Sequence, residues 1–376
     1  MNKKTKIISL IVGWRLALFL FAYLATFVLP LIKRFTANEY GNLPYFLWIW
    51  GRFDGYFYMS IAQKGYQFFE QGYFPFYPIV IHLFASGFQR PAAFIIAGQF
   101  ISIFSFLLSL YIIYKLLKLD YKKVNFVFFL SIILFFPTSI FYVAVYNDSL
   151  FLLLASLTLY FARRRKWTTA SLFGTLAAFT RLNGLALVPF ILFEYVLVSK
   201  HKFLSLKRII KSKIYSVIFI PLGFVGYLIY LHFLFGKFNS LFISMKLWNQ
   251  DKLTFPPQVV WRYIKIFTTA DPHLFIYWVA VLEFLFVLFY VFMLIYSYKK
   301  IRLSYWVFFA ISILIPSLTG TFQGIPRYGL HLYPLFLSLA IFLEKKGIAY
   351  KTLYFIIGIG LLFFFTTCFT RGYFAA

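Results

Sequence analysis

One carboxylate, Asp54, lies in a stretch crowded with aromatic residues that runs from position 50 to position 66. The glycines Gly51 and Gly55 let the backbone turn sharply beside the acid, and the neighbouring rings would give it a flat surface. Such a surface suits a sugar, and a carboxylate can accept the proton of a sugar hydroxyl. One alternative stays open: the apolar residues of 56–63 have helical spacing, so Asp54 could simply cap an interfacial helix.

Three arginines lie on the expected outer side and away from the basic loop clusters, namely Arg52, Arg181 and Arg327. A guanidinium group can hold two phosphate oxygens at once. One carboxylate that accepts a proton, together with arginines that bind a phosphate, is the smallest set of groups that could transfer a glycosyl group from a phosphate leaving group to a hydroxyl. Asp148 is a possible second acid, although capping of the helix that follows it explains its position equally well.

Other kinds of active site lack support in the sequence. There is no His-x-x-x-His pair, no carboxylate cluster with metal-ligand spacing, no glycine-rich phosphate loop and no Ser-His-Asp pattern. The single cysteine, Cys368, excludes an internal disulfide and a cysteine-built metal cluster. We therefore predict no cofactor and no metal ligand, and leave open a variant in which Asp54 and Asp148 share a divalent cation.

The elements that must position these residues belong to a membrane protein. Of 376 residues, 62% are hydrophobic and 12% charged, and the mean hydropathy is +0.82, so no soluble domain of this size could bury the apolar surface. The net charge of +27 comes from 37 Lys and Arg against 10 Asp and Glu. The basic residues form short runs between apolar segments, such as 163–166 and 299–302, which is typical of cytoplasmic loops beside anionic lipid and argues against nucleic acid as a partner.

The amino-terminal end predicts a transmembrane helix. Residues 1–6 are basic and 7–31 are almost wholly apolar, which is long enough to cross a hydrocarbon core of roughly 30 Å. A cleaved signal peptide is the alternative, but the apolar run is long and lacks a convincing small-residue cleavage site. The amino terminus is then cytoplasmic, and Arg15 should face the helix bundle or a polar cavity.

Residues 32–91 are expected to form a long first outer loop that carries Asp54. Two prolines three residues apart interrupt the later apolar run, and 73–88 is short for a span, which favours a second interfacial helix. The next apolar segment, 92–114, ends at a group of lysines that should be cytoplasmic. That sidedness requires that 73–88 does not cross the membrane.

Two spans, 124–146 and 150–162, are expected to follow, and the segment after them has an unusual length. Residues 167–198 lie between two basic runs, the second over 200–213, so an even number of crossings must separate them. Half of this segment reaches only part of the way across a bilayer, which predicts two short helices meeting at 181–184. Arg181 and Asn183 would then form the floor of an outward-facing cavity, with a snorkelling or purely structural Arg181 as the alternative.

The remaining chain predicts five more spans and a second outer loop. The spans are expected at 215–235, 274–296, 304–318, 330–343 and 352–369, and the loop at 236–272 mixes polar and aromatic residues that include Trp248, Asn249 and Asp251. The fold class is an all-α polytopic membrane protein, a single domain over 1–376 with about eleven transmembrane helices. Interfacial helices are expected in its first outer loop.

Five short motifs occur in order along the chain. They are Phe53-Asp54 with Ile61-Ala62-Gln63-Lys64-Gly65-Tyr66, then Phe74 to Pro78, Phe136-Pro137-Thr138 with Tyr146 to Phe151, Arg181-Leu182-Asn183-Gly184, and Pro326-Arg327-Tyr328. Together they resemble the motifs of the GPI mannosyltransferase II (PIG-V type) family and its prokaryotic relatives, in the C superfamily of membrane glycosyltransferases. The chain departs from that pattern at Phe53, where Trp is usual, and at Asp148, where Glu is common.

The resemblance implies a polyprenyl-phosphate-mannose donor, a glycan or glycolipid acceptor, an inverting mechanism and an active site on the outer face of the membrane. Asp54 would be the general base, and Arg181 and Arg327 would bind the donor phosphate. The substrate would be lined by Arg52, Tyr56, Asn183 and Tyr328. The membrane would be the cell membrane in a prokaryote and that of the endoplasmic reticulum in a eukaryote.

A transporter or flippase of a lipid-linked sugar is the rival hypothesis. Intramembrane arginines and broken helices also mark transport pathways. The sequence shows no internal repeat, and its best candidate acid lies in a long outer loop, which favours the enzyme.

Overall fold

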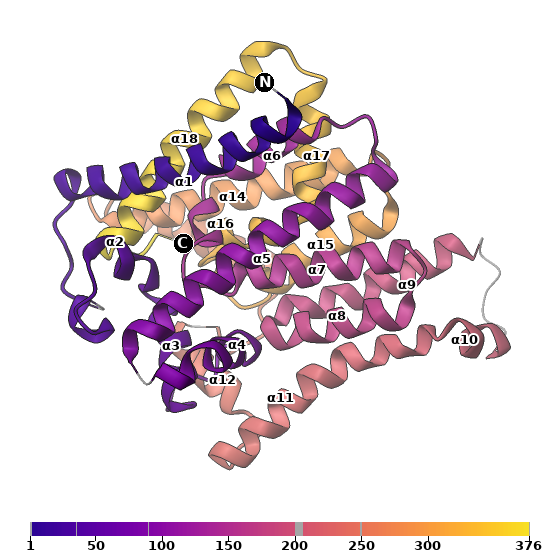
Figure 1. Ribbon diagram of the computed structural model, residues 1–376, viewed down its shortest axis with the longest axis horizontal. Coiled ribbons are helices and arrows are strands. Elements are labelled where there is room, and N and C mark those ends of the chain that lie inside the picture. Colours follow the sequence, from indigo (N-terminus) through magenta and orange to yellow (C-terminus); the bar gives the residue numbers. More distant parts are fainter. Residues whose placement is uncertain (1, 35, 89, 200–205, 249, 376) are drawn as a thin grey trace.

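The computed structural model describes residues 2–34, 36–88, 90–199, 206–248 and 250–375, and it is all-helical over these ranges (Figure 1). Part of the predicted basic run at 200–213 and position 249 of the second outer loop lie outside the described residues. The first elements are α1 (Lys3–Val28), η1 (Ala37–Tyr40), α2 (Tyr45–Trp48), η2 (Ile49–Gly51), α3 (Asp54–Lys64), α4 (Phe76–Ala85), η3 (Ser86–Phe88) and α5 (Pro91–Asp120).

The middle of the chain consists mostly of shorter helices. These are α6 (Phe126–Leu134), η4 (Ser139–Tyr142), α7 (Asp148–Arg163), α8 (Trp167–Thr180), η5 (Leu182–Ala186), α9 (Leu187–Val198), α10 (Leu206–Ser212), η6 (Ile214–Ile218) and α11 (Phe219–Phe235). The last part holds α12 (Ser240–Met245), η7 (Lys246–Trp248), α13 (Pro256–Thr269), α14 (Phe275–Ser297), α15 (Leu303–Ser317), α16 (Ile325–Tyr328), η8 (Gly329–His331), α17 (Tyr333–Glu344) and α18 (Ile348–Arg371).

Five of the described helices are long and apolar enough to cross a membrane. They are Lys3–Val28, Pro91–Asp120, Ile214–Phe235, Phe275–Ser297 and Ile348–Arg371. Four shorter apolar helices accompany them: Phe76–Phe88, Leu182–Val198, Leu303–Ser317 and Tyr333–Glu344. The predicted all-α membrane fold is confirmed at this level, and the number of crossings stays a prediction.

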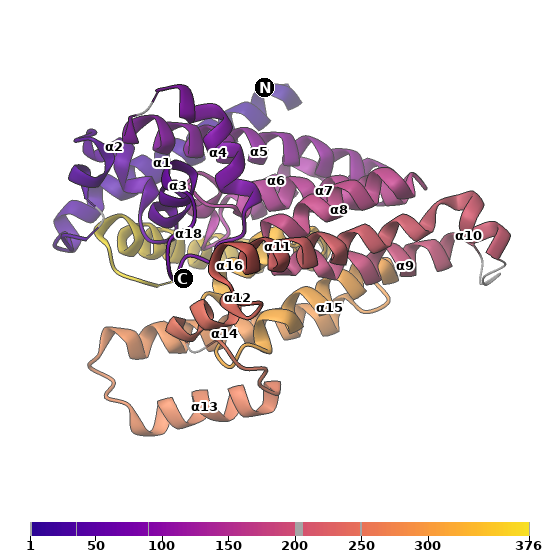
Figure 2. The same cartoon turned by 90° about the horizontal axis from the view of Figure 1, so that it is seen from below.

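The first and last long helices pack along each other, as α1 and α18 lie side by side (Figure 1). From this pair the bundle continues through α5, α7, α8 and α11, each packed against the next. Helix α13 lies apart from the bundle and runs beside α14 (Figure 2). The elements α2, α3 and α4 are short, as expected for the loop between α1 and α5.

Ion pairs join several helices at the end of the bundle where the sequence places the basic loops. Arg163 at the end of α7 binds the carboxylates of Asp120 and Glu194. Arg302, just before α15, binds the same buried Glu194 at 2.6 Å. Because one carboxylate serves two arginines, α7, α9 and α15 are held in register at this end.

One predicted helix is wrong. The span expected at 124–146 is α-helical only over Phe126–Leu134, and the chain then runs to Asn147 through buried, mostly irregular backbone that holds only the short 3-10 helix η4. Pro137 explains the end of the helix, because proline has no N–H to give and its ring clashes with the preceding turn. The freed backbone groups are bonded by other parts of the protein; for example, the Val145 N–H donates to the Trp50 carbonyl at 2.8 Å.

The predicted break in 167–198 is confirmed. Helix α8 ends at Thr180, Arg181 is extended at φ −158°, and a short 3-10 turn leads into α9. Gly184 makes this return possible, since a Cβ built there would lie 2.3 Å from the backbone nitrogen of Ala178. No side chain fits in that space.

We therefore expect Gly184→Ala to destabilise the protein. The methyl group would force the 182–186 turn away from α8, at a cost of about 1–3 kcal/mol for overpacking. Thermal unfolding in detergent measures this loss. Gly360→Ala is the control, because nothing lies within 4 Å of a Cβ at that position; equal unfolding temperatures for the two variants would contradict the close approach.

Candidate active site

Asp54 is the first residue of α3 and follows a backbone conformation that is rare for a non-glycine residue. Phe53 has φ +53° and ψ −119°, outside the helical and extended regions. The Tyr146 hydroxyl accepts the Asp54 N–H and bonds the Arg52 carbonyl, both at 3.2 Å. This turn fixes where the carboxylate of Asp54 points.

The carboxylate of Asp54 is engaged by two side chains. Oδ2 accepts a hydrogen bond from Nη1 of Arg327 at 2.8 Å, and the Tyr73 hydroxyl lies 3.4 Å from Oδ1. Burial, and then the charge of Asp54, raise the pKa of Tyr73 well above that of an ordinary phenol, so its hydroxyl stays protonated and can donate. The Asp54 side chain is 24% exposed and therefore reachable by a substrate.

Asp148 differs from Asp54 because its side chain is fully buried. It begins α7, and its Oδ1 atom lies 2.7 Å from Nη1 of Arg181 and 2.6 Å from Nε2 of His331. Capping does not account for Asp148, since its carboxylate is directed to these two partners and the N-cap position belongs to Asn147. Oδ2 of Asp148 is buried without a hydrogen-bond partner among the described residues.

Arg327 lies between the two acids. Its Nη1 binds Asp54, and its Nε is 3.9 Å from Oδ1 of Asp148. The guanidinium group of Arg327 thus occupies the space between Asp54 and Asp148, where a divalent cation shared by these two acids was the alternative. Within the described part of the chain, no group of three or more His, Cys, Asp or Glu side chains could hold a metal ion.

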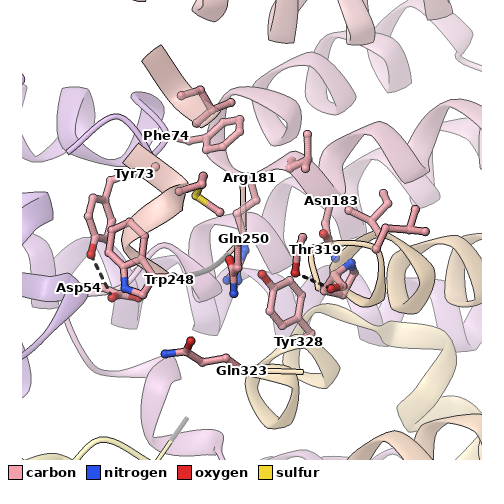
Figure 3. Close-up of a pocket in the computed structure, with 18 of the residues that line it drawn as sticks. Asp54, Tyr73, Phe74, Arg181, Asn183, Trp248, Gln250, Thr319, Gln323 and Tyr328 are labelled. Atoms are coloured by element: carbon pink, nitrogen blue, oxygen red, sulfur yellow. Dashed lines mark hydrogen bonds between the residues drawn. The ribbon is translucent and has the colours of Figure 1, made fainter. Parts of the chain in front are cut away.

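A cavity of about 450 Å³ opens beside these groups. Figure 3 shows Asp54 on one side with Tyr73 and Trp248, and Arg181 on the other near Tyr328 and Gln250. Much of the lining is aromatic or apolar, and carboxylate, guanidinium and amide groups are set into it. This combination suits a polyhydroxylated substrate that carries a charged group.

Four of the sequence-predicted residues besides Asp54 line the same cavity: Arg181, Asn183, Arg327 and Tyr328. The Arg181 guanidinium also lies 4.9 Å from the centre of the Tyr328 ring. The Asn183 side chain donates to the Ser312 carbonyl at 3.0 Å, so part of its amide is used to hold the helix break. Asp148 lies behind this lining, where it binds Arg181.

Two expected lining residues lie elsewhere. Arg52 is buried, and its guanidinium donates to the carbonyls of Thr370 (3.0 Å), Ile32 (2.7 Å) and Arg34 (2.6 Å), which ties the first outer loop to the end of α18. The Tyr56 ring packs edge-on against Tyr40, outside the cavity lining. Neither side chain is therefore among those that line the cavity beside Asp54.

His331 was not predicted. It is buried, bonded to Asp148, and 3.0 Å from Nη1 of Arg181. His331 follows Arg327 by four residues, and this spacing could have indicated that the two side chains lie near each other, because residues four apart lie on the same side of a helical turn. Tyr73 and Trp248 were also not predicted as lining residues, although both stood in stretches that the sequence singled out.

A known protein family matches most of the chain. The family model described as Mannosyltransferase (PIG-V) matches residues 31–312, which is about three quarters of the chain. Neither the curated proteins nor the solved structures gave a match.

Asp148 and Asp54 should respond differently to loss of charge. Asp148→Asn leaves Arg181 and Arg327 near a neutral buried group, and removing one partner of a buried ion pair costs about 3–5 kcal/mol. The partly exposed pair of Asp54 should contribute much less. Thermal unfolding of both variants tests this contrast, and an Asp148→Asn protein as stable as Asp54→Asn would contradict the structural role assigned to Asp148.

Proposed function

The chain belongs to the PIG-V mannosyltransferase family, and from this premise we propose that it transfers mannose from a polyprenyl-phosphate-mannose donor. The acceptor would be a lipid-linked or surface glycan on the outer face of the membrane. The observation that carries the proposal is the exposed edge of the Asp54 carboxylate, which lines a cavity together with Arg181 and Arg327. A proton acceptor and two phosphate-binding groups then border the same space.

The reaction would be a single displacement with inversion at the anomeric carbon. An acceptor hydroxyl gives its proton to Asp54 as its oxygen bonds the anomeric carbon, and the bond from that carbon to the lipid phosphate breaks. Positive charge develops on the sugar ring in the transition state. The polyprenyl phosphate leaves with the bonding electrons, and Arg181 and Arg327 stabilise its negative charge.

Arg327 would have two partners in turn. In the structure its Nη1 donates a hydrogen bond to Oδ2 of Asp54, so that oxygen is occupied and not open to an acceptor hydroxyl. The donor phosphate is a diester with one negative charge spread over two oxygens, which a guanidinium fork can bind together, and its charge grows as the bond to the sugar breaks. It would therefore draw the guanidinium toward itself. Asp54 would then be free to act as base only when the donor is bound, and Asp148 would keep Arg327 charged and in place.

The rival function is movement of a lipid-linked sugar across the membrane, and the break between α8 and α9 at Arg181 is the observation that favours it. Membership of a mannosyltransferase family supports the enzyme. Purified protein given a panel of polyprenyl-phosphate sugars, with and without a chelator, separates the two. Sugar transfer supports the enzyme, and movement across a liposome without transfer supports the transporter.

Asp54→Asn should abolish most of the activity while donor binding survives. The amide keeps the size of the side chain but cannot accept the proton, and general-base catalysis contributes ~10²–10⁴-fold. We expect turnover to fall at least about a hundredfold, with the donor KM changed far less. Asp271→Asn in an exposed turn is the matched control. Near-normal turnover by Asp54→Asn would exclude Asp54 as the base and make Asp148 the next candidate.

Arg327→Lys should weaken use of the donor. Lysine keeps the positive charge but loses the planar fork that can bind Asp54 or two phosphate oxygens. We expect the donor KM to rise roughly tenfold or more, whereas Arg90→Lys at an exposed position should behave as the wild type. Unchanged donor kinetics in folded Arg327→Lys would rule out the phosphate-binding role.

A further inference from the structure

Another buried carboxylate, Glu283, lies in α14 and plays no part in the mechanism above. Its side chain is 5% exposed, and it does not line the cavity. Oε2 accepts a hydrogen bond from the Tyr263 hydroxyl at 2.6 Å, and Oε1 accepts the Gly324 N–H at 3.2 Å. An acidic residue inside a helix long enough to cross a membrane is costly, so its partners point to its role.

Tyr263 extends the same set of bonds from α13. Besides donating to Glu283, its hydroxyl accepts the Phe322 N–H at 3.1 Å and lies 3.3 Å from Oγ1 of Thr321. Its ring packs on the Phe322 ring at 4.9 Å. Glu283 and Tyr263 therefore hold residues 321, 322 and 324 of the 321–324 loop from two different helices.

This loop leads directly to Arg327. Gly324 has φ +75°, a conformation that favours glycine, and α16 begins at the next residue. Gln323 and Gly324 themselves line the cavity. At the far end, the Pro326 carbonyl accepts bonds from the hydroxyls of Thr138 (3.0 Å) and Tyr290 (2.9 Å). The start of α16 is thus fixed from both sides, and Arg327 with it.

We propose that Glu283 and Tyr263 are positioning residues for donor binding, acting through the 321–324 loop on the guanidinium of Arg327. The proposal rests on the phosphate-binding role of Arg327 proposed above. It explains why a membrane-spanning helix carries an acid whose bonds go to a loop and to a tyrosine of an outer helix. Neither residue touches the substrate; both determine where Arg327 is when the donor arrives.

Tyr263→Phe is the direct test, because it removes one hydroxyl and leaves the packed ring. We expect the donor KM to rise roughly tenfold, as for one lost hydrogen bond, with the acceptor KM unchanged and the unfolding temperature lowered only modestly. Tyr354→Phe is the matched control: its hydroxyl donates to the Ile132 carbonyl at 2.9 Å, and it does not line the cavity. Glu283→Gln exchanges one acceptor oxygen for an amide that donates, so it should also raise the donor KM. It is the test variant if Tyr263→Phe does not fold.

Two further measurements separate positioning from a general structural role. If Tyr263 acts through Arg327, the double variant Tyr263→Phe with Arg327→Lys should be little worse than Arg327→Lys alone. Binding of polyprenyl phosphate to the intact protein needs no turnover and should weaken by a similar factor. Additive effects, or Tyr263→Phe kinetics equal to those of Tyr354→Phe, would overturn the positioning role and leave the transferase standing. A wild-type protein that neither transfers mannose nor binds polyprenyl phosphate would overturn both proposals.

Discussion

The site depends on one constraint, which is that the charge of Arg327 must be paired where it lies. A buried guanidinium without a partner is costly, and two carboxylates from distant parts of the chain share it. Asp54 comes from the first outer loop and Asp148 from the start of α7. The pairing therefore brings together three segments that the sequence separates by many residues, and the exposed side of Asp54 is left facing the cavity.

Irregular backbone inside an apolar bundle follows from this arrangement. Long α-helices are interrupted at 135–147, at 181–186 and at 318–332, where the chain forms only short helical turns and irregular backbone. In a low-dielectric interior each freed N–H and carbonyl needs a partner, and these segments supply partners to one another. Tyr142, for example, donates to the Leu330 carbonyl at 2.7 Å, and Asn147 donates to that of Thr180 at 2.8 Å. The helix breaks thus gather where the charged side chains are.

Some of these features could be predicted from the sequence and others could not. The fold class and the break at Arg181 were predictable, because segment length and basic runs restrict how a chain can cross a membrane. The placement of Arg52 was not, since an arginine that binds three carbonyls is indistinguishable in sequence from one that binds a phosphate. The role of His331 was not predictable for a related reason: only its spacing from Arg327 pointed to it, and the role depends on a contact with Asp148, 183 residues earlier in the chain.

The contrast between Arg52 and Arg327 also explains how Asp54 is held. The guanidinium of Arg52 donates hydrogen bonds to the carbonyls of residues 32, 34 and 370, so it fixes the backbone on one side of the start of α3. Tyr146 bonds both Arg52 and Asp54 on the other side. Between them Phe53 keeps a positive φ, a strained state that persists only when its surroundings enforce it. Structural bonds to backbone thus place the acid, and its carboxylate keeps side-chain bonds from Arg327 and Tyr73, of which the bond from Arg327 is the one that we propose the donor exchanges.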